Sequence, residues 1–170
     1  MTSKSGLADQ NGPGADPVVT SEILPKPGCA TASGPATGGY TAYSQPLSGT
    51  ASFIGIGKVH LDYTLTGGPT ATVNARLWDD PPGDDTDPLL ISRGTYRIDE
   101  VAGDPATGTL TLPLFGNHYI FENGHRIRLD VTQVDQPYLR PSNPESALTF
   151  EPPRLALPTR ESGDRTISGD

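Results

Sequence analysis

Side chains of alternating character recur along the middle of this chain with a period of two. In KVHLDYTL, residues 58–65, every second side chain is apolar and those between them are polar, charged or His. In RIRLDVT, residues 126–132, the same alternation places Ile127, Leu129 and Val131 on one face. Because successive side chains of a β-strand point to opposite faces, this period indicates strands with one buried face. No segment shows helical periodicity over three turns, so the sequence predicts an all-β fold.

Further strands are expected between these two and after them. In ATVNARLWD the alternation places Val73, Ala75 and Leu77 inward and Trp78 on the opposite face. Gly94, inside LLISRGTYRID, predicts a β-bulge, and Gly67-Gly68-Pro69 predicts a hairpin-type turn. With 20 Gly and 18 Pro in 170 residues, tight turns between short elements are expected. The remaining segments are GTLTLPLF, SALTF and RLALP, which bring the total to about eight strands, as in a jelly roll or related sandwich.

Composition divides the chain into three parts. Residues 1–37 are rich in Gly, Pro, Ser, Thr and Ala, and we expect a flexible arm or linker there. Residues 38–160 hold the strand pattern and form one predicted sandwich. Residues 161–170 are polar and are predicted to be a disordered tail.

Charge excludes two classes of partner. The formal net charge is −8 with 12 Lys and Arg residues that form no basic stripe, so nucleic-acid binding is not expected. No apolar run approaches the roughly 20 residues of a membrane-spanning helix, and the first residues lack the apolar core of a signal peptide. The chain as written is therefore expected to be soluble and cytoplasmic, with no membrane partner.

Known catalytic and metal-binding patterns are missing from the sequence. The G-x-S-x-G pattern of a hydrolase nucleophile is absent, so we expect no catalytic residue in this chain. Cys29 is the single cysteine, which excludes an internal disulfide. His60, His118 and His125 form neither an i, i+4 pair nor a His-x-His pair. His118 and His125 are expected to bond local backbone groups in turns, and no metal or cofactor is predicted.

Two further features leave alternatives open. The loop DDPPGDDTD, residues 79–87, crowds carboxylates as a calcium site does, but its spacing is not that of an EF-hand. A solvated acidic hairpin tip is the favoured reading. Trp78, Tyr96 and Tyr138 are candidates for an aromatic platform that binds sugars, with a role in packing or domain contact as the alternative.

One long motif carries a family resemblance. Residues 116–143, GNHYIFENGHRIRLDVTQVDQPYLRPSN, resemble a signature of the C-terminal β-domain of the Xaa-Pro dipeptidyl-peptidase and cocaine-esterase (CocE/NonD) family of serine α/β-hydrolases. The matching positions are Gly124 to Leu129, then Pro137, Tyr138, Arg140 and Asn143. ARLWDD followed by LLISRGTYRID, and GGYTAYSQPL, are similar to further strands of the same domain, so the resemblance spans about residues 38–160.

The resemblance implies a galactose-binding-like jelly roll that packs against an α/β-hydrolase domain holding the catalytic Ser, Asp and His. This chain carries none of those residues. The expected function is a non-catalytic accessory domain that stabilises or gates the hydrolase, with an α/β-hydrolase domain or chain as partner and a homodimer as a further possibility. The alternatives are a free-standing carbohydrate-binding module and, below it, a structural or adhesive surface domain.

The proline-containing end of this motif gives a prediction of its own. Pro137 and Pro141 bracket Arg140 and stiffen the backbone, so Arg140 is expected to pair with Asp130 or Asp135. Arg126 and Arg128 share a strand face with Asp130, while Asp135 and Arg140 flank the turn. These groups are expected to form charge-assisted hydrogen bonds that fix the loop. The candidate binding residues, for a ligand or a domain interface, are thus Trp78, Tyr138 and Arg140.

Overall fold

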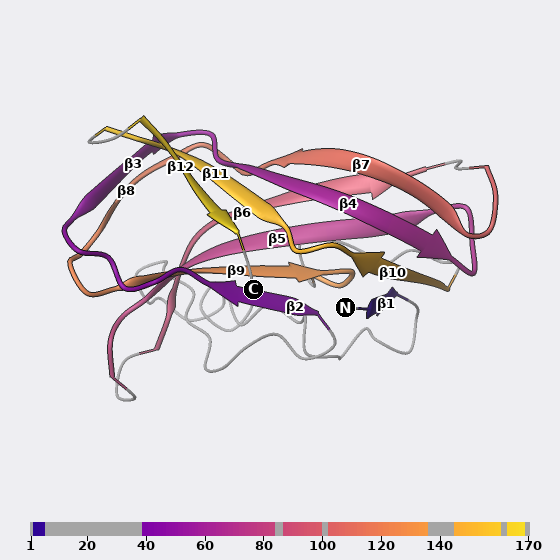
Figure 1. Ribbon diagram of the computed structural model, residues 1–170, viewed down its shortest axis with the longest axis horizontal. Coiled ribbons are helices and arrows are strands. Elements are labelled where there is room, and N and C mark those ends of the chain that lie inside the picture. The colour runs from indigo at the N-terminus through magenta and orange to yellow at the C-terminus, as the bar shows by residue number, and fades with distance from the viewer. Residues whose placement is uncertain are drawn as a thin grey trace, which may run out of the picture.

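A computed structural model describes residues 2–5, 39–83, 87–99, 102–135, 145–160 and 163–168 of the chain. Within these ranges the chain forms β-strands and no helix (Figure 1). The strands are β1 (Thr2–Ser5), β2 (Tyr40–Tyr43), β3 (Ala51–Gly55), β4 (Lys58–Thr66), β5 (Ala71–Asp80), β6 (Leu89–Ile98), β7 (Ala106–Pro113), β8 (Asn117–Phe121), β9 (Arg126–Thr132), β10 (Ser146–Phe150), β11 (Arg154–Thr159) and β12 (Gly163–Ser168).

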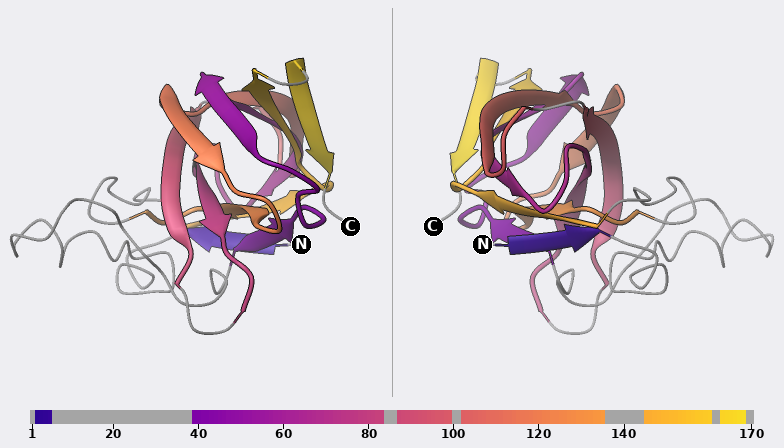
Figure 2. Two further views of the ribbon diagram at one scale, coloured as in Figure 1. Left: turned by 90° about the vertical axis from the view of Figure 1, so that its left-hand side faces the viewer. Right: turned by 90° about the vertical axis from the view of Figure 1, so that its right-hand side faces the viewer.

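The strands form two antiparallel sheets that pack face to face. The larger sheet has the order β1-β10-β4-β11-β3-β8, with β7 paired to β4 and β12 paired to β11. The smaller sheet has the order β2-β9-β5-β6. The end views show the sheets curving around a shared interior (Figure 2). This architecture confirms the predicted all-β fold and is consistent with a jelly-roll sandwich.

The core lies between the inner faces of the two sheets, and the predicted alternation places its residues correctly. Val59, Leu61 and Leu65 of β4 are buried, as are the inward residues of β5, β7 and β9. The buried apolar residues of those three strands are Ala71, Val73, Ala75, Leu77, Ala106, Leu110, Leu112, Ile127, Leu129 and Val131. At roughly 25 cal/mol for each Å² of apolar surface removed from water, this shared interior is the main source of stability.

Two local predictions are wrong. Gly67-Gly68-Pro69 does not close a hairpin, because it joins β4 to β5, which lie in different sheets. Gly94 does not mark a bulge, because it pairs in regular register with Ala75, and the irregularity in register lies between Leu77 and Trp78. A Cβ at position 94 would collide with the carbonyl oxygen of Pro113 at the end of β7. Glycine there permits the close approach of the two sheets.

Strands β1, β3, β8 and β12 were not predicted as separate strands. Strand β3 precedes the predicted alternation and ends at Gly55, with φ of 117°, before β4 begins. Strand β8 lies inside the motif used for the resemblance. Strands β1 and β12 lie in the segments predicted as arm and tail, and they pair with β10 and β11 respectively.

Hydrogen bonds join the two sheets along one side of the sandwich. The backbone N–H of Phe115 donates to the carbonyl of Arg93 at 2.7 Å, and the Ser92 hydroxyl donates to the carbonyl of Phe115 at 2.7 Å. The Asn117 side chain donates to the carbonyl of Ile91 at 2.6 Å. The start of β8 is therefore held against the edge strand β6 of the smaller sheet.

Candidate functional site

The outer face of the four-stranded sheet carries polar side chains in rows that run across the strands. Strand register places Arg93 opposite Arg76, Arg76 opposite Asp130, and Asp130 opposite Thr41. Although this face points away from the apolar core, the exposed fractions of Arg76 and Asp130 are only 3% and 0%. A buried charge costs several kcal/mol unless it is paired, so these groups must satisfy one another.

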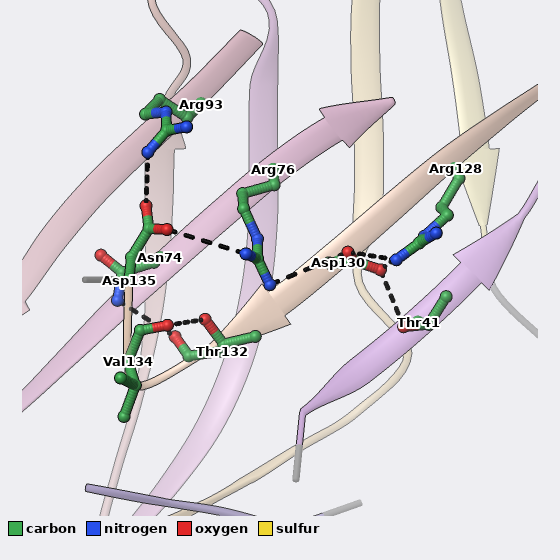
Figure 3. Close-up of polar contacts among 9 residues, drawn as sticks. All are labelled: Thr41, Asn74, Arg76, Arg93, Arg128, Asp130, Thr132, Val134 and Asp135. Atoms are coloured by element: carbon green, nitrogen blue, oxygen red, sulfur yellow. Dashed lines mark hydrogen bonds and ion pairs between the residues drawn. The ribbon is translucent and has the colours of Figure 1, made fainter. Parts of the chain in front are cut away.

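Ion pairs connect the charges into a chain, which Figure 3 shows from Arg93 to Arg128. Asp130 accepts hydrogen bonds from Nε and Nη2 of Arg128 at 3.0 and 2.8 Å and from the Thr41 hydroxyl at 2.8 Å. Nη2 of Arg76 lies 3.9 Å from Asp130, and Nη1 of Arg76 lies 3.8 Å from Asp135. Asp135 also accepts from Nη1 of Arg93 at 3.3 Å. Of the predicted charge-assisted bonds, those from Arg128 to Asp130 are confirmed, whereas Arg126 is exposed.

A second row lies beside the ion pairs. The Thr95 hydroxyl donates to Asn74 at 2.9 Å, and the Asn74 amide donates to the carbonyl of Thr132 at 3.5 Å. The Thr132 hydroxyl in turn donates to the carbonyl of Val134 at 2.7 Å (Figure 3). These bonds link β6, β5 and β9 through side chains as well as through their ladders.

Trp78 belongs to the same outer face and is fully buried. Its ring lies between two guanidinium groups, 5.7 Å from Arg76 and 5.2 Å from Arg128, at distances where cation–π attraction operates. The hypothesis that Trp78 offers an exposed face to sugars is therefore wrong, because its exposed fraction is 0%. The other two candidate binding residues, Tyr138 and Arg140, lie outside the described residues.

Tyr43 marks the solvent-facing end of the row that holds Trp78. Register places it opposite Arg128, and 41% of its surface is exposed. Partial burial raises the pKa of the Tyr43 phenol above its ordinary value of 10.0, an effect that the nearby Arg128 guanidinium opposes. The phenol thus stays protonated, and available as a hydrogen-bond donor, throughout the physiological pH range.

A second polar cluster lies where β5 ends and β9 begins. Asp79 accepts a hydrogen bond from the Tyr119 hydroxyl at 2.6 Å, and its oxygens lie 2.9 and 3.0 Å from Nδ1 of His125. Two predictions fail here. Asp79 is not part of a solvated tip, because it is 3% exposed, and the ring of His125 contacts this distant carboxylate rather than local backbone.

The chemistry available to this cluster is that of an oriented imidazole. An ionised carboxylate can only accept, so Nδ1 of His125 carries a proton toward Asp79, and in the neutral ring Nε2 is then the acceptor. That arrangement is two thirds of a Ser-His-Asp triad. Within the described part of the chain, no Ser, Thr or Cys side chain hydrogen-bonds to His125.

The remaining histidines and the acidic loop add no further site. The ring of His60 lies 3.0 Å from the Thr111 hydroxyl on the polar side of β4. Asp84 and Asp85 lie outside the described residues, so the choice between a calcium loop and an acidic tip stays open. The described ranges contain no group of three or more His, Cys, Asp or Glu residues placed to hold a metal ion, and no helix able to cross a bilayer.

Large apolar side chains are exposed at one corner of the larger sheet. Ile54, Ile56, Phe115 and Ile120 expose between 46% and 68% of their surfaces, and we name them the β3–β8 patch. On β3 and β8, Phe53 and Phe121 point into the core while the neighbouring residues point out. Ile54 and Ile120 of this patch thus lie on the outer face of the larger sheet, whereas the buried rows lie on the outer face of the smaller sheet.

Comparison with known proteins places this fold. No protein-family model matches the chain, and no curated protein matches it. Among solved structures, an α-amino acid ester hydrolase matches with a TM-score of 0.57 and 17% identity, over 72% of this chain and 25% of the hydrolase. An aminopeptidase from a marine sediment Thaumarchaeota archaeon matches with a TM-score of 0.57 and 15% identity, over 76% of this chain and 26% of the enzyme.

A CocE/NonD family hydrolase from Staphylococcus aureus matches with a TM-score of 0.55 and 7% identity, over 77% of this chain and 30% of the hydrolase. The chain shares its fold with part of these hydrolases. At such low identity the likeness concerns the fold alone, and at that level it confirms the resemblance seen in residues 116–143. The chain spans about a quarter to a third of the length of the enzymes it matches.

Proposed function

We propose that the chain is a non-catalytic accessory domain of a serine α/β-hydrolase, which packs against the catalytic domain and stabilises or gates it. The observation that carries the proposal is the asymmetry of coverage. The match takes in 72% of this chain but only 25% of the α-amino acid ester hydrolase. A chain with this fold therefore corresponds to one portion of such an enzyme.

The polar clusters support a structural role for this chain. The ion pairs of the smaller sheet are buried and directed at one another, so their charges are occupied in holding β2, β9, β5 and β6 together. The cluster of Asp79, His125 and Tyr119 likewise ties the end of β5 to β8 and β9. A stiff sandwich of this kind is suited to brace a neighbouring domain, because its own strands resist rearrangement.

A hydrolysis assay and a binding assay test the proposal. The purified chain should not hydrolyse p-nitrophenyl esters or Xaa-Pro anilides, and turnover that a serine-directed inhibitor abolishes would contradict the non-catalytic role. The α/β-hydrolase encoded in the same or the adjacent gene should bind the chain and gain at least several degrees in thermal midpoint. Absence of any complex, with both proteins folded, would contradict the accessory role.

The alternative function is a free-standing carbohydrate-binding module, and its main support was an exposed Trp78, which the structure does not show. Trp78 is buried between two arginines and offers no ring face to a sugar. Tyr96, at 42% exposure, is the candidate that stays exposed among the described residues of the proposed platform. A glycan array in which binding depends on Tyr96 would restore this alternative.

A further inference from the structure

Exposed apolar surface is concentrated at one place on this molecule. Among the described residues, six large hydrophobic side chains are exposed, and four of them make up the β3–β8 patch. The other two, Tyr43 and Tyr96, carry hydroxyl groups and lie on the smaller sheet. A cluster of aliphatic and aromatic side chains in water marks an interaction surface more often than isolated exposed residues do.

Two of the four side chains share one face of adjacent strands, and the other two lie in the segments that follow β3 and precede β8. Ile54 pairs with His118, and Ile120 pairs with Ser52, so the two isoleucines project diagonally from the same side of adjacent strands. Ile56 follows directly after the end of β3 and is 55% exposed. A Cβ built on Gly116 would lie 3.5 Å from Cγ1 of Ile56, which places Ile56 beside the residue that follows Phe115.

The patch is also rigid. Phe53 and Phe121, which alternate with the exposed isoleucines, are fully buried in the core. The backbone of Phe115 is held at both its N–H and its carbonyl by residues of β6. A rigid surface loses little conformational entropy when a partner covers it, which favours binding.

We propose that the β3–β8 patch is the surface on which the catalytic domain of the hydrolase docks. This inference rests on the proposed function and specifies its interface. In the solved enzymes with this fold, the match covers 25–30% of the chain length. The rest of each enzyme is therefore two to three times as long as the matched part. A domain in that setting has a large neighbour, and domain interfaces within a chain typically bury about 600 to 1,500 Å².

Charge favours this occupant over a second copy of the chain. The outward residues of β3 and β8 in the patch include no Asp or Glu, although the chain contains 20 of them. Docking therefore buries apolar groups without removing a carboxylate from water. Two copies, each with a net charge of −8, would repel one another as they approach. The expected partner surface is apolar and belongs to an α/β-hydrolase domain.

Photo-crosslinking tests the location of the interface. The photoreactive residue p-benzoylphenylalanine replaces Ile120 in one variant and Tyr96, of similar exposure on the other sheet, in a second. Each variant is produced together with the α/β-hydrolase of the same or the adjacent gene, and cross-linked peptides are identified by mass spectrometry. We expect position 120 to cross-link to the α/β domain and position 96 not to do so.

Substitutions then measure the contribution of the patch. The double variant Ile54→Ser with Phe115→Ser should bind the same hydrolase at least tenfold more weakly, while Tyr96→Ser should leave the Kd unchanged. The midpoint of urea unfolding, measured on each variant without the hydrolase, shows whether that variant is folded. Because all three side chains are at least 42% exposed, we expect these midpoints to stay close to that of the unmodified chain.

The outcomes separate the interface from the function. If the hydrolase binds the double variant as tightly as the unmodified chain, or if position 120 cross-links to a second copy, the interface is wrong and the accessory role stands. If the unmodified chain binds no hydrolase in any arm, both the accessory role and this interface are overturned.

Discussion

Removal of the Asp130 carboxylate should be among the most damaging single changes in this molecule. Asp130 accepts three hydrogen bonds, two from Arg128 and one from Thr41. Its exposed fraction is 0%, and that of Arg128 is 2%. In Asp130→Ala, the Arg128 guanidinium would lose both of these bonds without gaining access to water. Breaking a buried pair in this way typically costs about 3 to 5 kcal/mol of unfolding free energy.

The chain offers a matched control with the same residue types and spacing. Arg97 and Asp99 also form an Arg-x-Asp pair, with Nε 3.2 Å from the carboxylate, but their side chains are 61% and 51% exposed. Solvent screens such a pair, and exposed pairs contribute less than about 1 kcal/mol. Asp99→Ala should therefore change the unfolding free energy by only a few tenths of a kcal/mol, by the same principle.

Urea unfolding at pH 7 measures both variants. The fluorescence of Trp78, the single tryptophan, reports on the smaller sheet, and far-UV circular dichroism reports on all strands. Trp78 lies 5.2 Å from Arg128, so agreement between the two probes guards against a purely local spectral change. If Asp130→Ala and Asp99→Ala lower the free energy of unfolding equally, burial does not govern the strength of these pairs and the reasoning fails.

Three other predictions concern packing, ionisation and the cluster at the end of β5. Gly94→Ala should lower the thermal midpoint by several degrees, because the added Cβ meets the β7 backbone. Gly49→Ala, with open space around it, should not lower the midpoint. Equal midpoints for the two variants would contradict the close approach of β6 to β7. The phenol of Tyr43 should titrate above pH 10.0 by ultraviolet absorbance. Its contribution to stability is present below pH 10.0 and is lost as pH rises through the higher folded pKa, and Tyr43→Phe should remove that dependence. Tyr119→Phe should cost about 1 kcal/mol in urea unfolding, since the buried Asp79 loses one donor; no loss would show that the bond is dispensable.

Alternation in the sequence was sufficient to predict the fold class and the inner faces of the sheets. Val59 and Leu61 of β4, and Leu129 of β9, are buried as their period indicated. The likeness to hydrolases was also available from residues 116–143. Pairing was harder to predict, because antiparallel neighbours in a sandwich are often distant in sequence. Nothing local in Gly67-Gly68-Pro69 distinguishes a hairpin from a crossover between sheets.

The candidate site was predicted only in part, because alternation does not reveal how deeply the second face of a strand is buried. Strand β5 is buried on both faces, with polar residues on one of them. Period two therefore assigned Trp78 to an outer face correctly but its solvent exposure wrongly. The contact between Asp79 and His125 joins residues 46 positions apart, and no motif signals it. The Arg128-x-Asp130 spacing was the one local sign of the ion pairs.

The rows of charges also affect how the smaller sheet finds its correct alignment during folding. A slip of one residue in β5 would turn Arg76 toward the core and bring Leu77 among the ionised groups of the other face. In a sheet with one solvated face, only the apolar side penalises such a slip. Here both faces do, because Arg76 of β5 reaches Asp130 and Asp135 only in the native alignment. Single-residue insertions or deletions within β5 or β9 should therefore be tolerated far less than length changes in the turns that join the strands.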